Sequence, residues 1–144
     1  MSFNKIEETT FASPQITTAD IDRAIAQGVK VIINNRPDYE EGGQPLNADL
    51  QSYAEEKGLT WHHIPLVGGN LSEEHITLSV AAFKESAPTL AFCRSGTRST
   101  MLWGLAMAAT HALSTDEILE KASGAGYDFA MQRGLFEQVR NLHP

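Results

Sequence analysis

The sequence contains a single cysteine, Cys93, among its 144 residues. One cysteine excludes an internal disulfide, and proteins without disulfides are typical of reducing compartments. The first residues are polar and carry no apolar run of the kind that a secretory signal peptide needs. Together these two absences predict a cytoplasmic protein.

Basic residues are also scarce, because 11 lysines and arginines stand against 18 aspartates and glutamates, for a formal net charge of −7. This balance argues against nucleic acid or an anionic membrane as a partner. No apolar run reaches the roughly 18 residues that a membrane-spanning helix needs. With 42% hydrophobic and 20% charged residues, the chain has the composition of a globular protein. At this length we expect one domain, residues 1–144.

Helix and strand patterns alternate along the chain, which predicts an α/β fold of three layers, with a mainly parallel central sheet flanked by helices. Apolar and β-branched segments predict strands at residues 29–33, 59–64 and 88–92. The segment after residue 99 is apolar on all sides and is therefore expected to be a buried central helix. Capping residues and apolar spacing predict helices that begin near Thr17, Asn47, Ser72, Ser99, Ser114 and Asp128.

The loops that follow the predicted strands are expected to lie together. Ligands of open α/β sheets bind beyond the carboxyl ends of the strands. Residues 34–45, 65–70 and 93–98 follow three such strands, so they should share one edge of the sheet. This makes Arg36 and Asp38 candidate neighbours of Cys93, either as substrate ligands or as a structural pair within a turn.

The segment Cys93-Arg94-Ser95-Gly96-Thr97-Arg98-Ser99 lies between a predicted strand and the apolar helix. Strand, small-residue loop and helix in this order surround a thiol with backbone N–H groups and a helix N-terminus. Such surroundings can lower the pKa of a cysteine from about 8.5 to roughly 3.5–7.5. A buried, inert cysteine is the simpler interpretation, but the two flanking arginines favour a nucleophile. The candidate anion ligands are Arg94, Ser95, Gly96, Thr97 and Arg98, and the Ser99 hydroxyl is a candidate donor to the sulfur.

The pattern Cys-x-x-Gly-x-Arg-Ser resembles two families. Rhodanese-type sulfurtransferases often carry Cys-Arg-Ser-Gly-x-Arg-Ser in a loop of six residues, the length of residues 93–98. Cysteine-dependent tyrosine and dual-specificity phosphatases use a loop that is one residue longer. The two helices expected after residue 113 are unlike a rhodanese, and the order of elements resembles the dual-specificity phosphatase fold.

A larger part of the chain, from about residue 13 to residue 128, is similar to the phosphatase-like family named for β-lactamase hydrolase-like proteins, also described as a sulfurtransferase family. One departure is Phe92, where that family often has histidine. Because some members are fused to a persulfide dioxygenase, the resemblance implies such an enzyme as a partner. The matching segments are Ser13-Pro14-Gln15, residues 33–40, Gly43-Gln44-Pro45, Ile64-Pro65, residues 93–99, Leu102-Trp103 and Ala125-Gly126-Tyr127-Asp128.

Two reactions suit this loop. Phosphomonoester hydrolysis needs a nucleophile, an oxyanion clamp and an acid for the leaving oxygen. Cys93 and Arg98 supply the first two, but no aspartate occurs between residues 50 and 113, which leaves Asp38 as a candidate acid. Sulfur transfer through a Cys93 persulfide needs no acid. The sequence therefore favours a sulfurtransferase that passes sulfur from thiosulfate or a persulfide to a thiol or a cyanide-type acceptor.

A cysteine-dependent phosphatase acting on phosphomonoesters such as phosphotyrosine is the alternative, and a non-catalytic domain that binds anions or phosphoproteins is another. The expected ligand is accordingly a small anionic sulfur donor or a phosphate ester. No cofactor is suggested. A metal site is not expected, because the adjacent His62 and His63 point to opposite faces of a strand. The pair Glu40-Glu41 is interpreted as a solvated surface.

Overall fold

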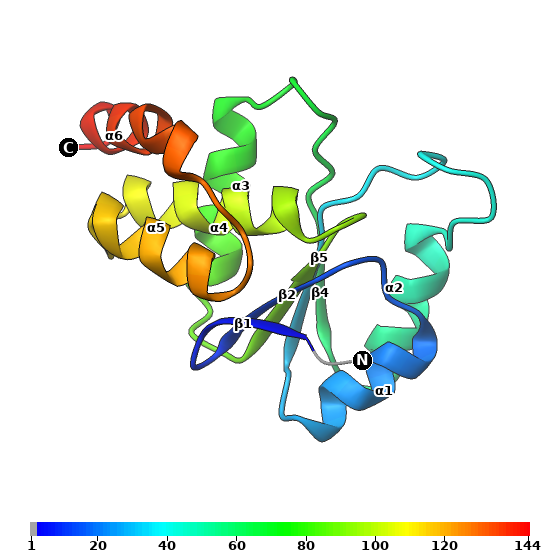
Figure 1. The fold of residues 1–144 in the computed structure, drawn as a ribbon. Coiled ribbons are helices and arrows are strands. Elements are labelled where there is room, and N and C mark those ends of the chain that lie inside the picture. The colour runs from blue at the N-terminus through cyan, green and yellow to red at the C-terminus, as the bar shows by residue number, and fades with distance from the viewer. Residues whose placement is uncertain (1–2) are drawn as a thin grey trace.

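A five-stranded sheet separates two layers of helices, which confirms the three-layer α/β architecture (Figure 1). The computed structural model describes residues 3–144. Helices α1 and α2 cover one face of the sheet, and α3 to α6 lie on the other. The strands are β1 (Asn4–Glu7), β2 (Thr10–Ser13), β3 (Val31–Asn34), β4 (Thr60–His63) and β5 (Thr89–Phe92). The helices are α1 (Thr18–Ala26), α2 (Asn47–Glu56), α3 (Glu73–Phe83), α4 (Thr97–Ala109), α5 (Thr115–Gly124) and α6 (Arg133–Leu142), with a 3₁₀ turn η1 (Ala130–Gln132) before α6.

The strand order is β1-β2-β5-β3-β4, and only the β1–β2 pair is antiparallel. The mainly parallel sheet is thus confirmed, but the sequence patterns missed β1 and β2. These two strands have four residues each and contain several polar side chains, so their hydrophobic signal is weak. The predicted strand at 29–33 begins later than expected, because the Val29 N–H still bonds to Ala24 O at the end of α1.

The parallel strands end in register, and this register builds the edge that carries the site. Ser13 of β2 pairs with Phe92 of β5, Phe92 pairs with Asn34 of β3, and Asn34 pairs with His63 of β4. The loops that leave these four strands therefore start from one row across the sheet. The expectation that the loops share one edge is confirmed.

Side chains of the central strands alternate between the two helical layers. Ile32 and Leu90 pack against α1 and α2, whereas Ile33 and Ala91 face α3. Burying both faces accounts for the continuous apolar runs of these strands.

Helix α4 is the buried central helix that the sequence predicted, with Trp103 only 1% exposed. Gly104 lets α6 approach it closely, since a Cβ at this position would lie 2.8 Å from Phe136 Cε1. The final helix begins at Arg133 and not near Asp128, because the Asp128 carboxylate accepts the Ala130 N–H in a local turn. Within residues 3–144, none of the helices has the length and apolarity required to cross a bilayer.

We expect Gly104→Ala to lower the free energy of unfolding, although alanine favours helix by about 1 kcal/mol over glycine. The added methyl group would press on the fully buried ring of Phe136, and overpacking costs about 1–3 kcal/mol. Gly124→Ala is the matched control, because Gly124 is helical and a Cβ there would meet nothing within 4 Å. Urea denaturation of both variants measures the difference, and equal stabilities would contradict this packing.

Candidate active site

Cys93 is the first residue after β5, and its side chain is fully buried. Its N–H donates to Ser13 O at 3.3 Å, so the end of β2 fixes the start of the loop. Its Sγ accepts a hydrogen bond from the Gly96 N–H at 3.1 Å. The loop therefore turns back over the thiol and brings a backbone donor to the sulfur, as expected of a loop that holds a thiolate.

Gly96 is the residue on which this turn depends. It is the N-cap of α4 and has φ +95°, a conformation that favours glycine. A Cβ at this position would also lie 2.1 Å from Tyr127 Oη, so the space admits no side chain. Tyr127 Oη in turn donates to Ser95 O at 3.1 Å and accepts from Asn4 Nδ2 at 2.8 Å. The tyrosine thus forms one wall of the loop.

Tyr127 was not among the predicted site residues. The one signal for it was its place in a segment that matched the family pattern. Burial raises the pKa of Tyr127, and nearby Cys93 contributes in the same direction, whereas the bond from Asn4 opposes the shift.

Gly96, the N-cap residue of α4, provides no side-chain cap for the positive end of the helix. The predicted anion ligands Ser95 and Thr97 bind each other, because Ser95 Oγ donates to Thr97 Oγ1 at 3.0 Å and accepts from the Thr97 N–H at 3.3 Å. Their hydroxyl groups stiffen the loop. Ser99 Oγ is buried and has no hydrogen-bond partner among residues 3–144, so the expected bond to the Cys93 sulfur does not form.

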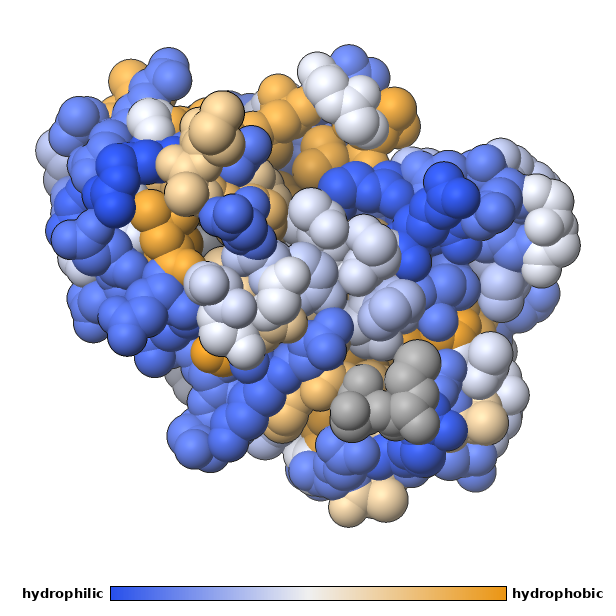
Figure 2. All heavy atoms as spheres, in the orientation of Figure 1, coloured by the Kyte–Doolittle hydropathy of each residue, from blue (hydrophilic) through white to orange (hydrophobic). Residues whose placement is uncertain are grey.

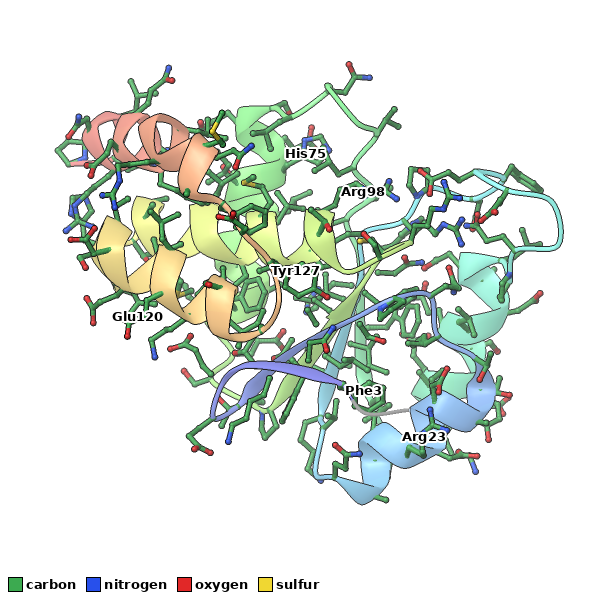
Figure 3. All side chains as sticks on the ribbon, viewed as in Figure 1. Phe3, Arg23, His75, Arg98, Glu120 and Tyr127 are labelled. Atoms are coloured by element: carbon green, nitrogen blue, oxygen red, sulfur yellow. The ribbon has the colours of Figure 1, made fainter. Side chains whose placement is uncertain are left out.

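Arg98 extends from the first turn of α4 toward the loop between β3 and α2 (Figure 3). Its Nη1 and Nη2 atoms donate to the two carboxylate oxygens of Glu40, both at 2.8 Å. Nη1 also donates to Leu66 O at 2.8 Å. The hydrogen bonds from Arg98, together with one from Arg36, lower the pKa of Glu40 to about 2, and Glu40 raises the pKa of Arg98.

Arg36 is the buried centre of the same network, with only 3% of its surface exposed. It donates to Glu40 Oε1 at 2.9 Å, to Glu41 Oε1 at 2.7 Å and to Gln15 Oε1 at 3.0 Å. Burial opposes the charge of Arg36, but the bonds to Glu40 and Glu41 outweigh it and raise the pKa. Glu41 also lies 3.6 Å from the exposed Arg94.

The two glutamates therefore connect Arg36 to both loop arginines. Both are exposed, as predicted, but their interpretation as a merely solvated surface missed these ion pairs. Glu40 is the site residue that sequence reasoning missed most clearly, although it closes the family segment at residues 33–40. In the space-filling view a strongly hydrophilic band covers the region of the β3–α2 loop (Figure 2).

Asp38 caps a helix, although the sequence made it a candidate neighbour of Cys93 and a candidate acid. Its Oδ1 accepts the Asn47 N–H at 2.8 Å and so caps α2, whose N-cap residue provides no side-chain bond of its own. Among residues 3–144, Arg36 pairs with glutamates and makes no ion pair with Asp38. Of the two alternatives for these residues, the structural Arg36–Asp38 pair is therefore wrong. The Asp38 carboxylate is turned toward α2, which leaves its use as a general acid without support.

The loop after β4 is held in place by polar contacts at both ends. The Leu66 N–H donates to Asn35 O, which fixes the carbonyl that Arg98 uses. Farther along, His75 Nδ1 accepts the Ser72 N–H, so its Nε2 carries the proton that bonds Pro65 O at 2.9 Å. In the part of the chain that the structure describes, no three metal-ligating side chains gather.

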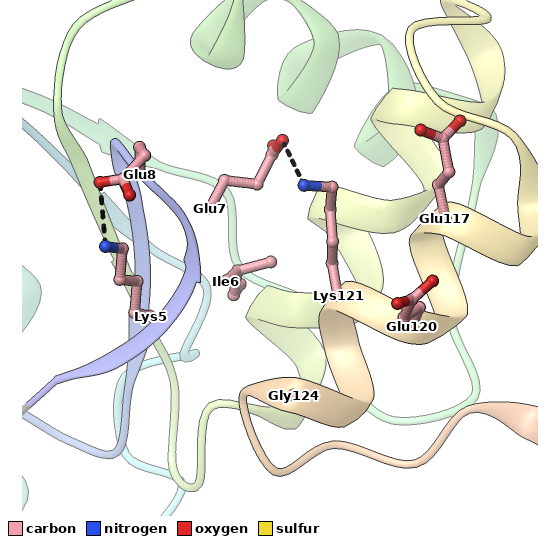
Figure 4. Close-up of a pocket in the computed structure, with 8 residues that line it drawn as sticks. All are labelled: Lys5, Ile6, Glu7, Glu8, Glu117, Glu120, Lys121 and Gly124. Atoms are coloured by element: carbon pink, nitrogen blue, oxygen red, sulfur yellow. Dashed lines mark hydrogen bonds and ion pairs between the residues drawn. The ribbon is translucent and has the colours of Figure 1, made fainter.

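A cavity of about 580 Å³ lies elsewhere, between β1 and α5 (Figure 4). Two ion pairs lie within it, since Lys5 lies 2.9 Å from Glu8 and Lys121 lies 3.6 Å from Glu7, and Glu117 and Glu120 also line it. None of the residues of the cysteine loop lines this cavity. We therefore place the candidate active site at Cys93.

Comparison with known proteins identifies relatives of both the sequence and the fold. A family model described as the phosphatase-like domain of beta-lactamase hydrolase-like protein matches residues 2–110. A beta-lactamase hydrolase-like protein of Agrobacterium fabrum is 34% identical over 125 residues, which cover 86% of this chain and 29% of that protein. The chain thus spans about three-tenths of the length of this relative.

Solved structures with the same fold also include phosphatases. A Neisseria meningitidis protein provisionally assigned as a phosphatase is 34% identical, with a TM-score of 0.83 over 97% of this chain and 99% of that one. The Pseudomonas aeruginosa protein TpbA, crystallised as a cysteine-to-serine variant with phosphotyrosine, shares the fold at 11% identity. Its TM-score is 0.64, over 95% of this chain and 86% of that one.

These relatives correct the predicted reaction. The sulfurtransferase interpretation, with its Cys93 persulfide, is wrong, because the matching family is phosphatase-like and the structural relatives are phosphatases. A thiolate in an anion-binding turn suits either reaction, and the prediction of sulfur transfer rested on the lack of an aspartate between residues 50 and 113. Nothing in the comparisons supports the persulfide dioxygenase as a partner.

The fold is that of the tyrosine and dual-specificity phosphatases, as the order of elements indicated. With a family model that covers residues 2–110, the chain belongs to the phosphatase-like domain family of the beta-lactamase hydrolase-like proteins.

Proposed function

We propose that this protein is a cysteine-dependent phosphatase that hydrolyses phosphomonoesters with Cys93 as the nucleophile. The observation that carries the proposal is the contact between Cys93 Sγ and the Gly96 N–H at 3.1 Å, at the N-terminus of α4. A thiolate and a phosphoryl group are both anions that such a helix terminus stabilises.

The reaction has two steps. Cys93 Sγ attacks phosphorus, the bond from phosphorus to the ester oxygen breaks, and the leaving oxygen takes up a proton from water. Water then attacks the phosphocysteine, which releases inorganic phosphate and restores the thiolate. Arg98 and the loop amides stabilise the negative charge on the phosphoryl oxygens in both steps. Ser99, whose hydroxyl is buried and unpaired among the described residues, is our candidate donor to the sulfur as the phosphocysteine breaks down.

An aryl phosphate such as phosphotyrosine is the substrate class that we favour. Support comes from TpbA, a protein of the same fold that was crystallised with phosphotyrosine. The exposed Arg94 at the loop surface, paired with Glu41, is placed to contact a substrate beyond its phosphoryl group. We place this activity in the cytoplasm on the cysteine content alone.

Cys93→Ser should abolish hydrolysis of p-nitrophenyl phosphate, because an alcohol is a far weaker nucleophile than a thiolate. The variant should keep its far-UV circular dichroism spectrum and its affinity for phosphate. Rapid acid quench of the wild type during turnover, followed by intact-mass measurement, should detect one phosphoryl group that Cys93→Ser lacks.

This experiment also separates the enzyme from a non-catalytic binding domain. A binding domain would retain phosphate but show no turnover, and its mass would not change during incubation with the ester. Turnover that survives in Cys93→Ser would refute Cys93 as the nucleophile.

Arg98→Ala should weaken phosphate binding by about 1.5–3 kcal/mol, the contribution of a hydrogen bond to a charged group. This corresponds to a loss of affinity of about 10- to 150-fold, measurable by isothermal titration calorimetry. Arg133→Ala is the control, because Arg133 lies on α6 and pairs with Asp116 on the surface. Equal losses in the two variants would show that overall charge, and not the site, governs binding.

A further inference from the structure

The peptide group between Ser95 and Gly96 brings a hydrogen-bond donor to the nucleophile. Its N–H, which belongs to Gly96, donates to Cys93 Sγ at 3.1 Å. The group is planar and trans, so its carbonyl, which belongs to Ser95, points in the opposite direction, away from the sulfur. Whatever holds the Ser95 carbonyl therefore also sets the direction of the Gly96 N–H.

The Tyr127 hydroxyl holds this carbonyl. It donates to Ser95 O at 3.1 Å, and within residues 3–144 no other group donates a hydrogen bond to that oxygen. Asn4 Nδ2 donates to Tyr127 Oη at 2.8 Å, which leaves the hydroxyl proton to Ser95 O. Burial raises the pKa of Tyr127, and the charge of nearby Cys93 adds to the shift, so the hydroxyl keeps the proton that it donates.

The local backbone does not fix the orientation of this peptide group. Gly96 has φ +95°, and glycine reaches other backbone conformations at little cost. The hydrogen bonds of α4 begin one residue later, with the Thr100 N–H and Gly96 O, and so do not hold Ser95 O. A rotation of the peptide group would remove the donor from the sulfur and turn the negative end of the Ser95 carbonyl toward it. The bond from Tyr127 opposes this rotation.

Tyr127 is itself held by regular structure. Its N–H donates to Ala122 O at 2.9 Å, in a turn that ends α5 and in which Gly126 has φ +101°. Helix α5 packs against α4 in one apolar core, and only 8% of the Tyr127 surface is exposed. Asn4, which orients the hydroxyl, lies on β1, and β1 pairs with β2 in the sheet. The hydroxyl is therefore fixed from the sheet and from the helical layer at once.

We infer that Tyr127 is a positioning residue, whose hydroxyl fixes the Ser95–Gly96 peptide group so that its N–H stays on the Cys93 sulfur. This inference rests on the proposed phosphatase function. The hydroxyl acts through the peptide group alone. Because hydrogen bonds in a chain polarise one another, the bond from Tyr127 also strengthens the Gly96 N–H as a donor. A donor to the sulfur favours the thiolate over the thiol.

Two ionisable side chains in the described part of the chain face the sulfur, and the test changes one of them. Arg98 is the other, since Cys93 contributes to its raised pKa after the hydrogen bond to Glu40. Tyr127→Phe removes the hydroxyl and keeps the ring that forms the wall of the loop. Arg98 and the α4 N-terminus stay in place, so a change in the ionisation of Cys93 reports the lost hydroxyl.

The deciding measurement is a pH titration of the Cys93 thiolate by its ultraviolet absorbance. The chain has one cysteine, so the signal that remains after subtraction of a matching Cys93→Ser blank belongs to Cys93. Absorbance also requires no reagent to reach this fully buried side chain. Tyr127→Phe should move the midpoint upward by about 0.5 to 1 pH unit, the scale expected when one hydrogen bond is weakened. Below the midpoint, kcat for p-nitrophenyl phosphate should fall by the corresponding factor of about 3 to 10, with a smaller change in KM.

Tyr53→Phe is the matched control, because the Tyr53 hydroxyl donates to Asp22 between α1 and α2. It should leave the midpoint unchanged. Asn4→Ala should move the midpoint in the same direction as Tyr127→Phe but by less, and it should add nothing in the Tyr127→Phe background. An unchanged midpoint in Tyr127→Phe, or full additivity of the two substitutions, would overturn the inference and leave Tyr127 a packing role.

The titration is independent of turnover. If no phosphate ester is hydrolysed, the proposed function fails, and the midpoints still decide the inference. If Tyr127→Phe does not fold, the midpoint of Asn4→Ala decides in its place, and a value equal to that of the wild type would overturn the inference.

Discussion

The site depends on the register in which four parallel strands end. Asn35, the residue after β3, makes this register rigid, because its N–H bonds Phe92 O and its side chain bonds Ile64 O. Its own carbonyl accepts the Leu66 N–H. Every loop that contributes to the site thus leaves the sheet from a fixed point, and Cys93 begins its turn from the same row. Without this shared origin, residues far apart in the chain could not meet at one thiol.

The buried charge of Arg36 sets the second constraint. Removing a guanidinium group from water is costly unless acceptors replace the water, and here Glu40, Glu41 and Gln15 do so. The long β3–α2 loop is therefore ordered by ion pairing, although it contains no helix or strand. Glu40 also forms an ion pair with Arg98. The ion pairs that order the β3–α2 loop therefore also fix the position of Arg98 beside the cysteine loop.

The features that could be predicted from the sequence are those that depend on residues close together in the chain, such as helix caps and apolar periodicity. The capping box of α5 and the all-apolar surface of α4 were read correctly, because cap bonds and periodicity act within one element. Glu40 was misread, since its partner Arg98 lies 58 residues away and only the shared sheet edge brings them together. The short strands β1 and β2 were missed because pairing with neighbouring strands, β2 with β5 and β1 with β2, and not hydrophobicity, makes them strands. The reaction was misjudged for a different reason, because the lack of an aspartate between residues 50 and 113 was given more weight than the resemblance to a phosphatase-like family.

The part of the chain after residue 110, where the matching family model ends, is not a separate addition to this site. Tyr127 follows α5 and forms the wall against which Gly96 turns, and its position requires α5 to pack on α4. Phe136 of α6 fills the space that Gly104 leaves on the same central helix. Both contacts act on α4, whose N-terminus is the anion-binding end of the loop. The C-terminal segment thus fixes the position of α4, through Tyr127 and Phe136. Glu40, which Arg36 anchors, fixes the side chain of Arg98.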